Sequence, residues 1–118
     1  MTFVGSDISK ARLDVGVRPG GETYSVANND AGIAELVAKL MAAPPTLVVM
    51  EATGGYELPA ATALAVAGIP LAVVNPRQVR DFAKATGRLA KTDALDAAVL
   101  AQFADVVRPE PRRLDDEK

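Results

Sequence analysis

Cysteine and histidine are both missing from this chain of 118 residues. The lack of cysteine excludes disulfides, thiolate metal sites and cysteine nucleophiles. The lack of histidine removes the usual general base and the usual zinc ligand, and it excludes every Ser-His-Asp triad. Any chemistry must therefore use carboxylates, hydroxyls, lysine or arginine, together with a metal that accepts oxygen ligands.

The chain also lacks an overall basic field, because its formal net charge is −2. The charge is uneven, however: residues 75–91 contain five basic side chains and one acidic side chain. A basic segment in an otherwise acidic chain indicates a surface that faces a polyanion. A charge run alone is weak evidence, and a merely solvated surface is the alternative.

A leader and a membrane span are not expected either. The N-terminus has no basic region followed by an apolar run, which argues against a signal peptide. Residues 58–74 are uncharged, but Gly68 and Pro70 interrupt them, so helix, turn and strand is the better interpretation. We expect one soluble, intracellular domain over residues 1–107 and a charged, proline-containing tail or linker over residues 108–118.

The hydrophobic pattern changes character along the chain. Residues 2–8, 11–18 and 23–27 are expected to be strands joined by short connections, which indicates an antiparallel meander. The apolar segments 47–50 and 69–74 show no alternation, which is typical of parallel strands covered on both faces. The predicted fold is α/β: a ribonuclease H-like mixed sheet, with a three-strand meander followed by two parallel strands and flanking helices. The sugar-kinase/actin half-domain has the same order.

Four helices are expected to flank this sheet. The first follows Asp30, the second covers residues 60–67, and the third is capped by Asn75-Pro76. The fourth is expected to begin at Thr92. Its inward side chains are predicted to be Leu95, Val99, Phe103 and Val106.

Two carboxylates stand at predicted strand ends. Asp7 lies near the end of the first strand, where aspartate is disfavoured, and Glu51 directly follows segment 47–50. Parallel neighbours lie about 4.8 Å apart and end at the same edge of a sheet, where open α/β sheets bind ligands. We therefore expect both carboxylates at one edge, although Asp7 could be a solubility charge and Glu51 could simply begin a loop.

Asp93 and Asp96 are three residues apart in the expected first turn of the last helix. Residues at this spacing share a helix face, and Asp96 borders the apolar stripe, so it is expected to point toward the sheet. An aspartate such as Asp93 in a first turn is by itself more often a helix-stabilising residue than a ligand. Four converging carboxylates would repel one another, and Mg²⁺ or Mn²⁺ would relieve that repulsion. Paired divalent ions held in this way suit in-line phosphoryl displacement.

Two further features fit a phosphate-containing partner. Thr53-Gly54-Gly55 precedes a helix, so its backbone amides could approach a phosphate, although a plain strand-to-helix turn is commoner. Basic residues recur along the third helix at spacings of three and four and could hold nucleic-acid phosphates. The residues predicted to contact nucleic acid are Lys10, Arg77, Arg80, Lys84, Arg88 and Lys91.

Three segments of the chain are FVGSDISKARLDV, VVMEATGGYE and NPRQVRDFAKATGRLAKTDALDA. Taken together, they resemble the N-terminal DEDD domain of bacterial insertion-sequence transposases related to the Piv DNA invertase. The acidic tetrad of that family falls on Asp7, Glu51, Asp93 and Asp96. The resemblance implies a RuvC-like fold in which these four residues are catalytic and bind divalent metal, and it implies a role in DNA recombination and transposition.

The resemblance implies partners as well: DNA, a structured guide RNA, and further copies in an oligomer of the full-length protein, all in the bacterial cytoplasm. Ser6 departs from the family, which more usually has a bulky apolar residue there. Family members also carry a C-terminal domain with a catalytic serine, whereas this chain ends at Lys118. We therefore expect a fragment or truncated product that is not fully active alone.

Two alternatives remain open on the sequence. A nucleotide-binding half-domain of the sugar-kinase/actin type would suit the first hairpin, but the chain would supply only one half of a two-lobed site. A non-catalytic nucleic-acid-binding or assembly module would use the carboxylates for folding alone.

Overall fold

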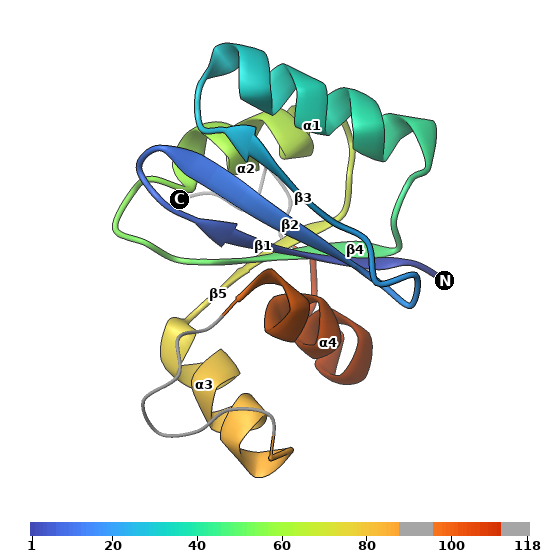
Figure 1. Ribbon diagram of the computed structural model, residues 1–118, viewed down its shortest axis with the longest axis vertical. Coiled ribbons are helices and arrows are strands. Elements are labelled where there is room, and N and C mark those ends of the chain that lie inside the picture. Colours follow the sequence, from blue (N-terminus) through green and yellow to red (C-terminus); the bar gives the residue numbers. More distant parts are fainter. Residues whose placement is uncertain (88–95, 112–118) are drawn as a thin grey trace.

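The computed structural model describes residues 1–87 and 96–111. Five strands form one mixed sheet in the order β3-β2-β1-β4-β5 (Figure 1). The strands are β1 (Phe3–Ile8), β2 (Arg12–Arg18), β3 (Thr23–Ala27), β4 (Leu47–Glu51) and β5 (Leu71–Val74). The helices are α1 (Asp30–Ala42), α2 (Leu58–Val66), α3 (Pro76–Ala85) and α4 (Ala97–Val107).

The pairing of the strands divides the sheet into two parts. β1, β2 and β3 pair in antiparallel fashion, whereas β1 with β4 and β4 with β5 are parallel. The predicted mixed sheet, an antiparallel meander followed by two parallel strands, is therefore confirmed. Both parallel crossovers return to the sheet through a helix, α1 or α2, as parallel pairing requires.

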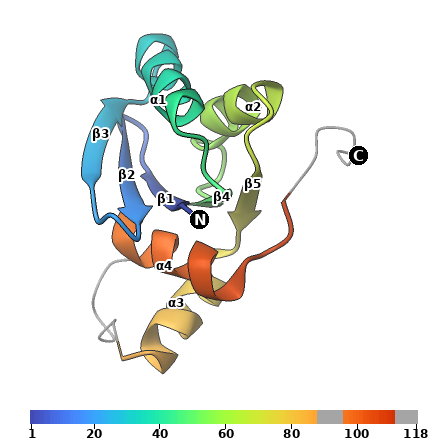
Figure 2. The ribbon, with the colours of Figure 1, turned by 90° about the vertical axis from the view of Figure 1, so that its right-hand side faces the viewer.

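Helices cover both faces of the sheet, α1 and α2 on one side and α3 and α4 on the other (Figure 2). Two apolar cores result. One joins α1 and α2 to the sheet through residues such as Leu36, Leu64 and Val48. The other joins α3 and α4 to the opposite face through Val79 and Phe103. The continuous apolar sequence of β4 follows from this double covering, because both of its faces are buried.

Side-chain caps determine where the helices begin. Asn29 accepts a hydrogen bond from the Gly32 amide at 2.8 Å at the start of α1, and Asn75 caps α3 through the Arg77 amide, also at 2.8 Å. Asp96 caps α4 by accepting from the Val99 amide at 2.9 Å. Each cap satisfies an amide that has no partner within its own helix.

The last helix differs from the prediction. It begins at Ala97, because Asp96 is extended, with φ −132° and ψ 175°, so the predicted start at Thr92 is wrong. Val106, predicted to face inward, is 58% exposed. Leu95 and Thr92 lie outside the described residues. The apolar periodicity thus predicted the helix correctly, but the cap at Asp96 places its first turn later in the chain than expected.

Two glycines let α4 approach the sheet closely. Gly5 on β1 and Gly16 on β2 are cross-strand partners that lie under the helix. A Cβ atom built on Gly5 would lie 2.2 Å from the Ala101 amide nitrogen, and one on Gly16 would lie 3.0 Å from the Ala97 carbonyl carbon. The backbone of α4 therefore rests on bare backbone of the sheet, which fixes the position of Asp96.

The proposed division at residue 107 stays a prediction, since residues 112–118 lie outside the described part. α4 ends at Val107, and an ion pair between Arg18 Nε and Asp105 at 2.7 Å fastens its last turn to β2.

Within residues 1–87 and 96–111, no helix is long and apolar enough to cross a membrane.

Candidate active site at the carboxyl edge of the sheet

Asp7 and Glu51 lie side by side where β1 and β4 end. The parallel register pairs Ser6 with Met50, so the next residue on each strand brings a carboxyl group to the same edge. The two carboxyl groups are close enough for each to affect the pKa of the other. Two carboxyl groups far apart in sequence thus come together as the sequence predicted.

The environment of this pair disfavours its charged form. Burial raises the pKa of Asp7, and the negative charges of Asp14 and Asp96 raise it further. Burial likewise raises the pKa of Glu51, followed by the charge of Asp7 and the hydrogen bond between them, while Arg80 acts in the opposite direction. The pair therefore concentrates negative charge that a proton or a cation would relieve.

Asp14 is a member of the site that the sequence analysis missed. It is the cross-strand partner of Asp7 and lies opposite Ser25 on β3. Ser25 Oγ donates a hydrogen bond to its carboxylate, and Arg12 Nε forms an ion pair with it at 3.1 Å. A hairpin centred between Lys10 and Ala11 would have revealed the pairing. The sequence predicted strands over residues 2–8 and 11–18 but not their register, so Asp14 was not paired with Asp7.

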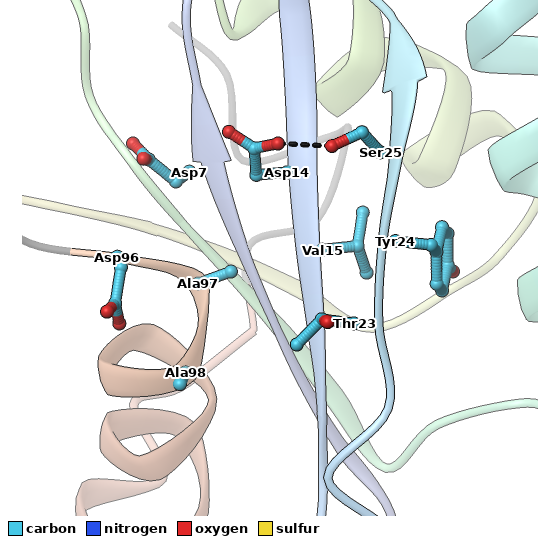
Figure 3. A pocket seen from close by; sticks show the side chains of 9 residues that line it. All are labelled: Asp7, Asp14, Val15, Thr23, Tyr24, Ser25, Asp96, Ala97 and Ala98. Atoms are coloured by element: carbon cyan, nitrogen blue, oxygen red, sulfur yellow. Dashed lines mark hydrogen bonds between the residues drawn. The ribbon is translucent and has the colours of Figure 1, made fainter.

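Asp96 approaches the site from α4. Asp7, Asp14 and Asp96 line one pocket of about 310 Å³ between the sheet and the first turn of that helix (Figure 3). Figure 3 shows the Asp96 carboxylate turned toward α4, in agreement with its bond to the Val99 amide. Asp96 thus caps the helix instead of lying within its first turn, which corrects the predicted helix-face geometry.

The complete tetrad cannot be described, because Asp93 lies outside the described residues. In the part of the chain that is described, no group of three or more acidic side chains is arranged to hold a metal ion. The structure therefore brings Asp7 and Glu51 into contact and places Asp96 nearby. It does not form a finished metal cage from these three residues.

The loop between β4 and α2 is closed by a buried carboxylate. Glu57, which is 7% exposed, accepts hydrogen bonds from the Thr53 amide at 3.0 Å, from Thr53 Oγ1 at 2.6 Å and from the Gly55 amide at 3.1 Å. Burial opposes ionisation of Glu57, but these hydrogen bonds outweigh it and lower its pKa. The amides of Thr53 and Gly55 are thus already occupied, which argues against the suggested phosphate cradle.

The predicted basic residues fall into three groups. Lys10 is exposed in the β1–β2 turn, and Arg77 and Lys84 are exposed on α3. Arg80 is half-buried, and its charge lowers the pKa of Glu51. Arg88 and Lys91 lie outside the described residues. Of the basic residues on α3, Arg80 therefore lies near the acidic edge, and Arg77 and Lys84 are on the exposed side of the same helix.

Comparison with known proteins finds one matching family and two solved structures of similar fold. The profile of the DEDD transposase family of the IS110 type, described as a transposase, matches residues 4–118. RuvC from Thermus thermophilus in complex with a Holliday junction substrate is similar in structure, with a TM-score of 0.65 at 17% identity, over 95% of this chain and 100% of that chain. A second Thermus thermophilus RuvC structure has a TM-score of 0.60 at 19% identity, with the same coverage. No curated protein matches the sequence.

Proposed function

Because the chain belongs to the DEDD transposase family of the IS110 type and has a RuvC-like ribonuclease H fold, we propose that it is the metal-dependent DNA-processing domain of a transposase. Its four acidic residues bind divalent cations and take part in DNA strand cleavage and transfer. These residues are Asp7, Glu51, Asp93 and Asp96.

The contact between Asp7 and Glu51 carries this proposal. Two neighbouring, half-buried carboxyl groups with raised pKa values at the carboxyl edge of a mixed sheet are an unfavourable arrangement for folding alone. Hard oxygen donors prefer Mg²⁺ or Mn²⁺, and the carboxylates of Asp7, Asp14 and Asp96 line the pocket at this edge. A bound cation would neutralise the negative charge that the two side chains bring together.

The chain's own residues have separable tasks in this proposal. Asp7 and Glu51 hold the cation at the strand ends, and Asp96 adds a carboxylate oxygen from the start of α4. When bound, divalent cations activate the attacking oxygen and stabilise the leaving oxygen of a phosphodiester. Arg80, beside Glu51, limits the excess negative charge where a DNA phosphate must enter.

Titration with Mn²⁺ tests the metal site. The wild-type chain is expected to bind Mn²⁺, and Glu51→Gln is expected to weaken that binding about a hundredfold, since it removes a charged ligand without changing shape. Glu35→Gln is the matched control, because Glu35 is an exposed carboxylate of α1 on the opposite face of the sheet. Calorimetry gives both affinities. Equal affinity in wild type and Glu51→Gln would refute the proposal.

We also propose that branched DNA is the substrate and that the basic side chains flanking the acidic edge contact its phosphates. The support is the fold shared with RuvC, whose structure holds a Holliday junction substrate, and the position of Arg77 and Lys84 on the exposed side of α3. Phosphate contacts release counterions, so binding should weaken steeply with salt.

Salt dependence provides the test of this interface. For a four-way junction, Arg77→Ala combined with Lys84→Ala is expected to flatten the plot of log affinity against log salt by about two, one unit for each lost phosphate contact. Lys39→Ala on α1 should leave the slope unchanged, because it lies on the opposite face. Gel-shift titrations at several salt concentrations measure both slopes. An unchanged slope in the double variant would place the DNA elsewhere.

Further partners follow from the family and remain proposals. A structured RNA would guide the choice of target, and several copies of the full-length protein would assemble on DNA in the bacterial cytoplasm. A purely binding or assembly role for this chain is the alternative, and the absence of Mn²⁺ binding would favour it.

A further inference from the structure

Asn28 connects the two loops that follow the paired carboxyl groups. Its Nδ2 group donates one hydrogen bond to the Ser9 carbonyl at 2.9 Å and another to the Tyr56 carbonyl at 3.1 Å. Its backbone amide donates to the Ala11 carbonyl at 2.9 Å. Ser9 is two residues beyond Asp7, and Tyr56 is five residues beyond Glu51. One half-buried amide side chain thus ties the turn after β1 to the loop between β4 and α2.

The restraint at the Ser9 and Tyr56 carbonyls reaches the site through the loops to which they belong. On the β4 side, the hydrogen bonds to Glu57 close the loop, and the Ala52 amide donates to the Val74 carbonyl at 2.9 Å. On the β1 side, the Ser9 amide donates to the Arg12 carbonyl at 2.9 Å. Because each loop is closed on itself, joining the loops fixes the distance between the strand ends.

A restraint is needed between the ends of β1 and β4, because the backbone pairing of these two strands stops before the carboxyl groups. The register of β1 and β4 ends at the pair Ser6–Met50, one residue before Asp7 and Glu51. Beyond that pair, the β1–β4 ladder does not fix the separation of the two residues that carry the carboxyl groups. The two side-chain hydrogen bonds of Asn28 join the loops that follow and so oppose separation of the strand ends.

We infer that Asn28 is a positioning residue: it holds the β1–β2 turn against the β4–α2 loop and so keeps Asp7 and Glu51 at the spacing that a shared cation requires. The role in cation binding rests on the proposed function, whereas the role in holding the loops does not. Asn28 touches neither carboxyl group in the hydrogen bonds described and acts through the backbone.

Spin-label distances test the mechanical part. The chain has no cysteine, so labels can be attached through Ala11→Cys and Tyr56→Cys, whose side chains are both exposed. The parent is expected to give one narrow distance distribution. Asn28→Asp, which keeps the shape but has no N–H donor and places charge beside two carbonyls, should broaden the distribution and lengthen its mean. Asn28→Ala, which adds no charge, should do the same and serves if the aspartate variant fails to fold.

Asn29→Ala is the matched control. It removes the adjacent asparagine, whose hydrogen bond caps α1, and should cost stability comparable to other lost N-caps, about 1 kcal/mol. Because Asn29 does not join the two loops, its replacement should leave the label distances unchanged. An unaltered distribution in both Asn28 variants, or equal broadening in Asn29→Ala, would overturn the inference.

Mn²⁺ affinity, measured on the same proteins without labels, tests the link to the site. Asn28→Ala should weaken binding about tenfold, the lower end of the range for residues that orient metal ligands, because the loops no longer hold the ligands in place, and Asn29→Ala should not. Loosened loops with unchanged affinity would refute the positioning role. A wild-type chain that binds no Mn²⁺ would refute the proposed function instead, and the distance measurement would still decide whether Asn28 holds the loops.

Discussion

Replacing Gly5 by alanine is expected to lower the free energy of unfolding by about 3 kcal/mol, the upper end for overpacking of a core. The added Cβ would lie 2.2 Å from the Ala101 amide nitrogen and 2.5 Å from the Ala97 carbonyl oxygen. Both atoms belong to the backbone of α4, so no side-chain rotation can relieve the clash. The helix must move away from the sheet, and Asp96 must move with it.

Gly16→Ala is the graded control for this prediction. Its Cβ would meet the Ala97 carbonyl carbon at 3.0 Å, a tight contact that small adjustments can accommodate, so a loss of about 1 kcal/mol is expected. Urea unfolding monitored by circular dichroism measures both variants. Gly5→Ala should also weaken Mn²⁺ binding under conditions where it remains folded, because it displaces Asp96. Wild-type stability of Gly5→Ala would show that α4 does not rest on the sheet as described.

Replacing Asp7 by asparagine is expected to abolish detectable Mn²⁺ binding and at the same time stabilise the fold. Burial first, and then the negative charge of Asp14, raise the pKa of Asp7 in the folded chain. The ionised form is therefore less favourable in the folded state than in the unfolded one. Removing the charge should increase the free energy of unfolding at pH 7 by roughly 0.5–1 kcal/mol, a small gain because solvent screens a half-buried group.

The pH dependence distinguishes this cause from others. Where the folded pKa exceeds the unfolded pKa, the folded state binds more protons, so wild-type stability should fall as pH rises from the ordinary aspartate range through the raised folded value. Asp7→Asn should lack the contribution of Asp7 to this decline. The pKa of Asp105 is lowered, chiefly by its hydrogen bond with Arg18, so Asp105→Asn should destabilise instead. A loss of stability in Asp7→Asn would show that Asp7 serves folding.

Local patterns were sufficient to predict much of the fold. Alternation in β2 and continuous apolar residues in β4 reflect how many faces of each strand are covered, so the division between meander and parallel strands followed from the sequence. The same patterns predicted that Asp7 and Glu51 lie at one edge of the sheet, because each stands at or near the end of an apolar strand. The family was also accessible, since its motifs are local.

The remaining members of the site depend on register and on contacts between distant segments. Asp14 faces Asp7 only because the hairpin is centred between Lys10 and Ala11, and a change of register moves side chains to other partners or to the other face. Asp96 is a cap and not a first-turn residue, because its carboxylate accepts the hydrogen bond of the Val99 amide in place of a backbone carbonyl.

The amino-acid sequence by itself determined the order of strands and helices along the chain and the acidic character of one sheet edge, because these depend on residue type and short-range periodicity. Only the tertiary structure decided how the edge is assembled. The backbone of α4 rests on Gly5, Glu57 binds amides of the β4–α2 loop, and Asn28 joins that loop to the β1–β2 turn. In each case backbone atoms are contacted by a residue from another part of the chain or loop. Packing sets the relative position of the two, and a periodic sequence pattern contains no information about it.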